Sequence, residues 1–264
     1  MYINLLLEFL HLLSIAVVLF IFIWWTALQI DNWSIVDIFW AYGFSIICAK
    51  YLFSYYEKIT GPSFVLIILT IAWSLRLGTH LAKRIFGNLK HEDGRYVKLR
   101  KQWSKDLNWK MFQFYMLQAL ILALLLTPIA SSILHEQKSL EAVHYVGLAL
   151  TVTAFIGELI ADQQLRNFKK TAPRNKVCDV GLWAWTRHPN YFFEWLIWVG
   201  FALLSYNTEY YALPGVLCAG LMFYLLNKVS GIPMTEEHLL SSKGEAYKKY
   251  QAKVPAFWPR KPKS

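Results

Sequence analysis

Long apolar stretches dominate the sequence and limit what kind of protein it can form. They cover residues 5–28, 36–53, 64–81, 112–134, 143–161, 191–204 and 213–226. Several of these stretches reach the roughly 20 residues that an α-helix needs to cross a bilayer. The chain is 56% apolar and 17% aromatic, which is above the apolar share of soluble domains. We therefore predict an all-α integral membrane protein, a bundle of seven transmembrane helices of which the sixth and seventh are short.

The net charge of +10 is concentrated in three segments. Residues 82–111, 160–191 and 227–264 hold nine, six and eight of the 27 lysines and arginines. If there are seven helices and the N-terminus lies outside, all three segments fall on one side, and the positive-inside rule makes that side the cytoplasm. The charge therefore predicts a cytoplasmic C-terminus and contact with membrane lipids, and it does not indicate nucleic acid.

The three cysteines, Cys48, Cys178 and Cys218, lie far apart in the sequence. Their spacing does not match a zinc site, and two of them fall in apolar stretches. We expect them to be packing residues, with no disulfide framework and no metal site.

Polar and titratable side chains inside or next to the apolar stretches gather at one predicted depth. Placing a charge in a bilayer costs a few kcal/mol, so such residues are functional candidates. Those near the predicted cytoplasmic ends of the helices are Asp37, Arg76, His80, Glu158, Asp162, Arg166, Asn190, Glu194 and Asn227. A cytoplasm-facing cavity with apolar walls and a charged mouth would satisfy them together. Such a cavity suits a polar, anionic cofactor from water and a hydrophobic substrate from the bilayer.

Each candidate also has a purely structural explanation. Asp37 follows Ser34 at the spacing of a capping box and could only satisfy amides at a helix N-terminus. Arg76 and His80, one turn apart, could extend toward the membrane interface.

The remaining candidates leave the same choice open. Glu158, Asp162 and Arg166 repeat every four residues and could form a salt-bridge ladder at a helix end. Residues 187–190 could begin a helix, with the arginine and histidine as interfacial anchors. The charged loop 90–103 could be solvated, or it could supply guanidinium groups for phosphates and a ring for stacking.

The sequence resembles the steroid 5-alpha-reductase superfamily, and most closely its bacterial branch of membrane reductases. The C-terminal similarity lies in "ADQQLRNFK" (161–169), "GLWAWTRHPNYFFEWLIWVGFAL" (181–203) and "EEHLLSSKGEAYKKYQAKVPAFWPRKP" (236–262). Residues 32–44, "NWSIVDIFWAYGF", and the segment 73–96 are similar too, so the resemblance extends over most of the chain. It implies a multi-pass protein of the bacterial inner membrane.

The resemblance also implies a cofactor and a set of residues that bind it. Residues 1–264 would form one membrane domain, in which the N-terminal helices enclose a lipophilic substrate and residues 150–264 bind NADPH. By similarity, the cofactor-binding residues are Arg95, Tyr96, Asp162, Arg166, Lys169, Arg187, His188, Asn190, Tyr191, Glu194, Tyr247 and Tyr250. Basic side chains would neutralise phosphates, while amide and carboxylate groups would hold the carboxamide and ribose hydroxyls.

The implied reaction is reduction of a carbon–carbon double bond conjugated to a ketone, as in a 3-oxo-4-ene steroid. Hydride would pass from C4 of NADPH to the beta carbon, and a proton would follow at the alpha carbon. A donor aimed at the carbonyl oxygen would stabilise the charge that develops there. The Gln-Glu pair and the Tyr with which eukaryotic steroid reductases polarise the ketone have no clear counterparts here. We expect Asp37, if burial keeps it protonated, or Arg76 or His80 to take that catalytic role.

Two other functions compete with this prediction, and the sequence sets no oligomeric state. Isoprenylcysteine carboxyl methyltransferases share patterns like "RHPNY" and use S-adenosylmethionine. The basic residues Arg95, Arg166 and Lys169 suit a cofactor with phosphates better than a phosphate-free sulfonium. A non-enzymatic lipid-binding or transport protein is the second alternative, but the chain lacks the paired halves that many transporters show.

Overall fold

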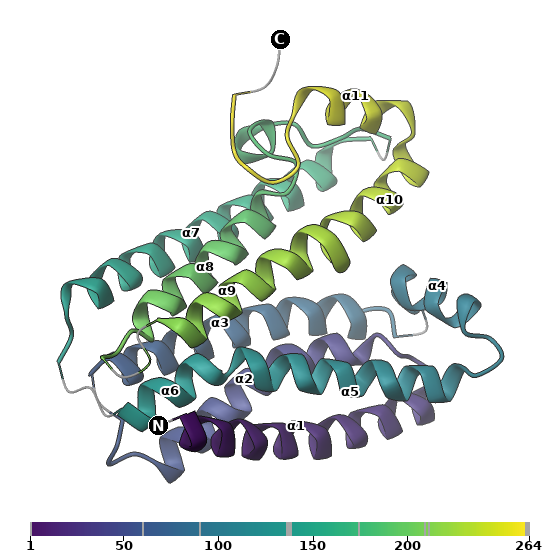
Figure 1. Ribbon diagram of the computed structural model, residues 1–264. Coiled ribbons are helices and arrows are strands. Elements are labelled where there is room, and N and C mark those ends of the chain that lie inside the picture. Colours follow the sequence, from purple (N-terminus) through teal and green to yellow (C-terminus); the bar gives the residue numbers. More distant parts are fainter. Residues whose placement is uncertain are drawn as a thin grey trace. The chain divides into compact units, whose positions relative to one another are not determined.

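A computed structural model describes residues 2–59, 61–89, 91–135, 139–173, 175–208, 210 and 212–261. Its regular elements in these ranges are all helices (Figure 1). The α-helices are α1 (Tyr2–Ile30), α2 (Ile35–Ser54), α3 (Gly61–Phe86), α4 (Gly94–Gln102), α5 (Leu107–Leu125), α6 (Thr127–His135), α7 (Ala142–Thr171), α8 (Pro189–Leu204), α9 (Leu213–Tyr224), α10 (Ile232–Lys243) and α11 (Glu245–Lys253). A short 3-10 helix, η1 (Gly181–Ala184), precedes α8, and a π-helical turn, η2 (Leu225–Val229), follows α9.

Six helical segments in the described ranges are long and apolar enough to cross a membrane. They are Ile3–Ile30, Ile35–Ser54, Gly61–Phe86, Leu107–His135, Ala142–Thr171 and Leu213–Lys243. A helical protein of the multi-pass membrane type is therefore confirmed. The seventh predicted stretch, 191–204, lies within α8, which has 16 residues and is apolar but shorter than these segments. The count of seven spans and the orientation of the termini stay predictions.

The predicted stretch 112–134 contains two helices. The α5 helix ends at Leu125 and α6 begins at Thr127, immediately before Pro128. A proline ring disfavours helical geometry at the preceding residue and has no N–H for the helical ladder. The apolar pattern continues across this point because hydropathy does not reveal an interruption of the helix.

The chain divides into two compact units. The first comprises Met1–Glu141 with Leu204–Pro214, and the second comprises Ala142–Leu203 with Gly215–Ser264. In the first unit, α1 packs beside α5, and α2 packs beside α3. Ser74 of α3 links the second pair, since its Oγ donates to the carbonyl of Ala41 at 2.6 Å and accepts from the backbone N–H of Ser45 at 3.0 Å. These bonds satisfy polar groups inside an apolar interface.

In the second unit, glycines let α7 and α8 approach closely. A Cβ on Gly157 would lie 2.4 Å from the Phe193 ring, and one on Gly200 would lie 2.1 Å from Thr151 Oγ1. Small residues at helix crossings of this kind are typical of membrane proteins. Aromatic rings of α8 and α9 pack against those of the C-terminal segment. The rings belong to Phe192, Trp195, Phe223, Phe257 and Trp258.

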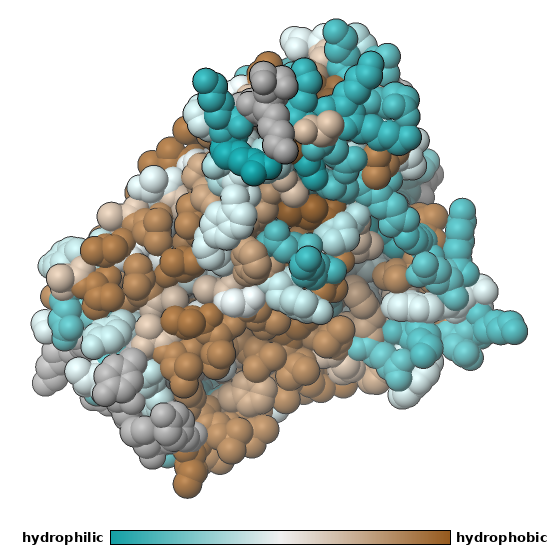
Figure 2. Space-filling model, turned by 45° about the horizontal axis from the view of Figure 1, so that its top comes forward, coloured by the Kyte–Doolittle hydropathy of each residue, from teal (hydrophilic) through white to brown (hydrophobic). Residues whose placement is uncertain are grey.

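Large hydrophobic side chains are exposed on many helices, and they form broad brown areas in Figure 2. They include Val18 and Phe22 of α1 and Ile156 of α7, which expose 69%, 63% and 51% of their surface. Apolar surface of this extent would be unfavourable in water and favours a lipid environment.

Candidate functional site

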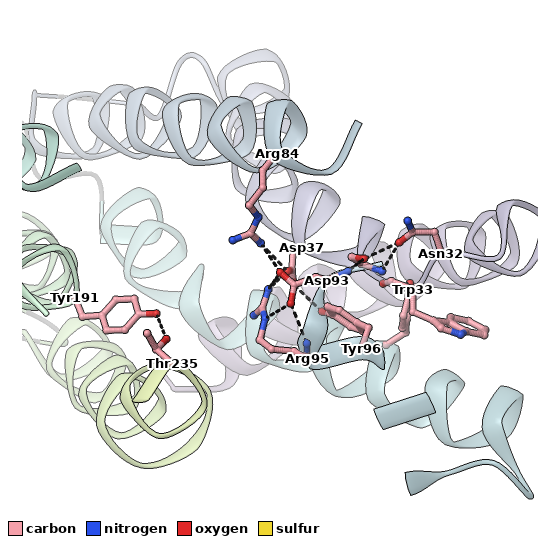
Figure 3. A network of polar contacts seen from close by, with 11 residues as sticks. Asn32, Trp33, Asp37, Arg84, Asp93, Arg95, Tyr96, Tyr191 and Thr235 are labelled. Carbon is pink, nitrogen blue, oxygen red and sulfur yellow. Dashed lines mark hydrogen bonds and ion pairs between the residues drawn. The ribbon is translucent and has the colours of Figure 1, made fainter. Parts of the chain in front are cut away.

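The first candidate site is a cluster of charges around Asp37 in the first turn of α2 (Figure 3). Arg95 Nη2 donates to one oxygen of Asp37, and the Tyr96 hydroxyl donates to the other at 2.6 Å. Arg95 also donates through Nε to Asp93 at 3.0 Å, and Arg84 of α3 lies 3.2 Å from Asp93. Two carboxylates and two guanidinium groups thus balance one another, with a buried phenol beside them.

The loop before α4 binds this cluster to the turn between α1 and α2. Glu92 accepts the backbone N–H of Trp33 at 2.7 Å and two hydrogen bonds from Arg100. The backbone N–H of Asp93 donates to Ser34 Oγ at 3.1 Å, and the Asn32 amide donates to the carbonyl of Leu89 at 2.8 Å. The predicted basic loop is therefore not simply solvated, because its acidic residues fasten it to the bundle.

The surroundings shift the pKa values of this cluster. Burial alone would raise the pKa of Asp93, but the hydrogen bonds and charge of Arg95 hold it below its usual value. Burial opposes the charge on Arg95, yet the neighbouring carboxylates raise its pKa. Burial and then the charge of Asp37 raise the pKa of Tyr96 well above its usual value. The cluster consequently holds a charged Arg95 beside a neutral phenol.

The capping explanation of Asp37 is wrong. Ser34 makes no side-chain cap bond, and its backbone N–H donates to Asn32 Oδ1 at 3.0 Å. The Ser34 hydroxyl is also engaged, since it donates to the same oxygen at 2.6 Å. Asp37 instead accepts from Arg95 and Tyr96, so its oxygens act as acceptors in this geometry and not as the donor that the proposed chemistry would require.

Arg76 and His80, the other predicted catalytic residues, lie one turn apart on α3. Arg76 is half-buried and His80 is exposed.

The second candidate site is centred on Glu236 of α10. Glu236 Oε1 accepts from Arg187 Nε at 2.7 Å, from His188 Nε2 at 3.1 Å and from the Tyr247 hydroxyl at 3.2 Å. Its other oxygen accepts from the Gln251 amide at 2.8 Å. Three predicted site residues therefore meet at one carboxylate that the prediction did not include.

Two residues of this cluster are held in defined protonation states. Burial lowers the pKa of His188, outweighing the hydrogen bond and charge of Glu236. The ring is therefore neutral at pH 7, and its Nε2 carries the proton because it faces a carboxylate. Burial also raises the pKa of Tyr247 and of Tyr250, and the Tyr250 hydroxyl donates to the carbonyl of Trp183.

The C-terminal residues 255–260 lie along residues 185–187, the segment that precedes α8, and we call them the strap. The backbone N–H of Arg187 donates to the carbonyl of Pro255 at 2.9 Å, and that of Arg260 donates to the carbonyl of Trp185 at 3.0 Å. Thr186 Oγ1 lies 3.0 Å from the carbonyl oxygens of Ala256 and Phe257. The strap and Glu236 together fix the entry into α8.

The motif residues beyond this entry lie on the first turns of α8. Pro189 is its first residue, which suits a position where no backbone N–H is needed. Asn190 Oδ1 is buried and has no hydrogen-bond partner among the described residues. Glu194, one turn later, is buried and accepts from the Trp198 indole at 3.1 Å. Tyr191 stacks on the His188 ring, and its hydroxyl lies 2.9 Å from Thr235 Oγ1 (Figure 3).

The predicted residues of α7 differ in exposure. Glu158 is buried and Asp162 half-buried, whereas Arg166 and Lys169 are exposed. Arg166 Nη2 donates to Gln163 Oε1 at 2.8 Å. Arg166 also lines an open hollow of about 440 Å³ along α7, next to exposed isoleucine and leucine side chains.

The glycine at the start of η1 is required by the backbone. Gly181 has a φ of +59°, a region that L side chains rarely adopt. A Cβ there would also lie 2.5 Å from the Gln164 side chain, whose Oε1 accepts the backbone N–H of Leu182 at 2.9 Å. This turn directs the chain from the end of α7 toward the "WTRHPN" segment.

Several central residues were absent from the predicted site. Glu236 and Asp93 organise the two clusters, and both lie inside segments that carry the family resemblance, "EEHLL" and "HEDGRY". Each was embedded among other charges of both signs, and no spacing rule distinguishes a buried carboxylate from exposed ones. The available signal was the pair Arg187 and His188 directly before an apolar stretch, because a cation at such a place needs a counter-ion from elsewhere in the chain.

Comparisons with known proteins give one family and one relative. The family described as "Protein of unknown function (DUF1295)" matches residues 22–254. A protein of Schizosaccharomyces pombe, described as "Uncharacterized protein C594.04c", is 27% identical over 263 residues, which cover 90% of this chain and 76% of that protein. No solved structure matches the chain.

Proposed function

The chain belongs to the family described as "Protein of unknown function (DUF1295)", and we propose that it is an NADPH-dependent membrane reductase of the steroid 5-alpha-reductase type. Its substrate would be a lipophilic molecule with a carbon–carbon double bond conjugated to a ketone, such as a 3-oxo-4-ene steroid. The substrate would enter from the bilayer. The chain would cross the inner membrane of a bacterial cell seven times, and its basic segments would face the cytoplasm.

The observation that carries this proposal is the buried Asn190 Oδ1, which lacks a partner among the described residues. A buried acceptor without a donor costs about 1–3 kcal/mol, so its retention favours a ligand that supplies an N–H. The carboxamide of a nicotinamide ring is such a donor. Asn190 lies at the position that resembles the cofactor contact of the steroid reductases, and Glu194 follows one turn later on the same helix.

The basic side chains available for phosphates are fewer than the sequence predicts. Arg95 is engaged by Asp37 and Asp93, and Arg187 by Glu236 and two backbone carbonyls. The proposal therefore assigns phosphate contacts to the exposed Arg166 and Lys169 at the end of α7. Arg95 and Arg187 would instead stabilise the segments around them through these hydrogen bonds.

NADPH would supply the hydride, and the chain would orient the reacting groups and stabilise charge. As the beta carbon gains hydride, negative charge builds on the carbonyl oxygen of the substrate. Arg76 or His80 of α3 would donate an N–H to that oxygen, which stabilises the transition state more than the ground state. Asp37 has a different part, because its two hydrogen bonds fix the position of Arg95 and Tyr96.

Ligand binding to the purified protein tests the proposal directly. We expect NADPH to raise the thermal unfolding temperature in detergent, and S-adenosylmethionine and NADH to have little effect. Asn190→Ala should weaken NADPH binding roughly fivefold, the effect of one neutral hydrogen bond. Asn175→Ala, at an exposed position, is the matched control and should bind NADPH as the wild type does.

The other outcomes identify the competing functions. Stabilisation by S-adenosylmethionine but not by NADPH would sink the reductase proposal and support the methyltransferase. If no cofactor stabilises the protein and a 3-oxo-4-ene steroid binds without being turned over, a lipid-binding or transport role becomes the better explanation.

A further inference from the structure

Glu236 joins three separate segments through one half-buried carboxylate. It accepts hydrogen bonds from Arg187 and His188 in the segment before α8, and from Tyr247 and Gln251 of α11. The Glu236 side chain exposes 15% of its surface, Arg187 10% and His188 2%, so water cannot replace these bonds freely. A carboxylate that accepts four hydrogen bonds, one of them from a cation, is held firmly in one orientation.

Two of the four donors are consecutive residues that donate to the same oxygen. Arg187 and His188 both donate to Glu236 Oε1, and Pro189 then begins α8. Arg187 also donates through Nη1 to the carbonyls of Gln251 and Val254. The segment is therefore fixed on one side by Glu236 and on the other by the C-terminal strap.

The position of Asn190 depends on this fixed segment. Asn190 is two residues after His188 and belongs to the first turn of α8, whose direction is set where the chain enters the helix. The same entry holds Tyr191, which stacks on the His188 ring at a centroid distance of 5.3 Å. A displacement of His188 would be transmitted to both side chains.

We propose that Glu236 is a positioning residue, which orders the Arg187–His188 segment and through it presents Asn190 and Glu194 to the cofactor. The identity of the ligand rests on the proposed function, whereas the ordering of the segment by Glu236 does not. The carboxylate is required because an uncharged substitute leaves the Arg187 guanidinium buried without a counter-ion.

A double-mutant cycle measures the proposed action of Glu236 on Asn190. Glu236→Gln keeps the size of the side chain and removes its charge, and we expect it to raise the Kd for NADPH about tenfold. In the Asn190→Ala background the same change should raise the Kd much less, because the contact that Glu236 positions is already lost. Glu237→Gln, the same change at the exposed neighbouring position, is the control and should leave the Kd unchanged. Effects that multiply in the double variant would overturn the proposal, since a general loss of stability acts independently of Asn190.

Hydrogen exchange tests the ordering without any ligand. Glu236→Gln should speed amide exchange in residues 185–191 and 254–260, with the first unit of the chain unchanged. Unchanged exchange in 185–191 would overturn the positioning role whatever cofactor the protein uses. If exchange rises but the wild-type protein does not bind NADPH, the proposed function fails and the ordering by Glu236 stands, and the cycle is then repeated with S-adenosylmethionine.

Discussion

Arg95 and Arg187 show how a residue type can suggest a ligand contact that neighbouring carboxylates make less favourable. Both were predicted to contact a cofactor, and both donate to carboxylates of the same unit. An arginine already bound to a carboxylate gains less from a phosphate, because the first bond must be broken or shared. Sequence alone gives the guanidinium but not its counter-ion, which for Arg187 lies 49 residues away.

The ion pair between Asp37 and Arg95 should contribute to stability. Asp37→Asn removes the charge and turns an amide N–H₂ toward a guanidinium or a phenol, so we expect the free energy of unfolding to fall by about 1–3 kcal/mol. This figure lies below that of a fully buried pair because Arg95 exposes 34% of its side chain. Thermal unfolding in detergent measures the change, with the exposed Lys101→Gln as control. A variant as stable as the wild type that has lost turnover would instead support a catalytic Asp37.

His188 should make stability depend on pH. Its pKa in the folded protein lies below the ordinary value of 6.5, since burial favours the neutral ring. The unfolded chain therefore binds more protons as the pH falls below 6.5, and the stability contributed by neutral His188 is lost in that range. The difference in unfolding temperature between the wild type and His188→Gln should shrink between pH 8 and pH 5. A difference that stays constant or grows would mean that His188 is charged in the folded protein.

At the scale of helices, the predictions that rest on hydropathy and helix length were the ones that held. Each apolar stretch lies in helical structure because helix length and hydropathy are properties of neighbouring residues. The capping box at Ser34 failed because Asn32 and Asp93 use the same hydroxyl, and Asp93 comes from a segment 59 residues away. Local spacing predicts what a side chain can reach, while the folded chain decides which of several partners it takes.

The crossing of α7 and α8 depends on Gly200. A Cβ at this position would lie 2.1 Å from Thr151 Oγ1 and 3.0 Å from the carbonyl oxygen of Gly147. Because one of these neighbours is backbone, the helices must separate, and we expect Gly200→Ala to lower the unfolding free energy by about 1–3 kcal/mol. Gly220→Ala in α9 is the control, since no atom lies within 4 Å of its Cβ and alanine is the better helix former. Equal unfolding temperatures for the two variants would contradict close packing at Gly200.

For the whole molecule, the number of spans depends on whether α8 crosses the membrane. The 16 residues of α8 rise about 24 Å, less than the roughly 30 Å of a hydrocarbon core. Bilayers thin around short helices at modest cost, so an apolar helix of this length can still cross. If it crosses, the chain has seven spans and Thr208, in the turn after α8, lies on the opposite side from Lys101. If it does not, Thr208 lies on the same side as Lys101. In that case α9 does not cross either, because Arg187 before α8 contacts Glu236 after α9.

Cysteine labelling separates these two topologies. In a variant with Cys48, Cys178 and Cys218 replaced by alanine, single cysteines are introduced by Lys58→Cys, Lys101→Cys, Thr208→Cys or Lys253→Cys, each at an exposed position. An impermeant maleimide applied to intact bacterial cells should label Lys58→Cys and Thr208→Cys, and the other two only after the membrane is opened. That pattern follows because seven spans with the N-terminus outside bring all three basic segments to the cytoplasm. Protection of Thr208→Cys in intact cells, with Lys58→Cys labelled, would show that α8 does not cross. Labelling of Lys253→Cys in intact cells would place the Glu236 cluster and the strap outside, away from cytoplasmic NADPH, and the reductase proposal would fail.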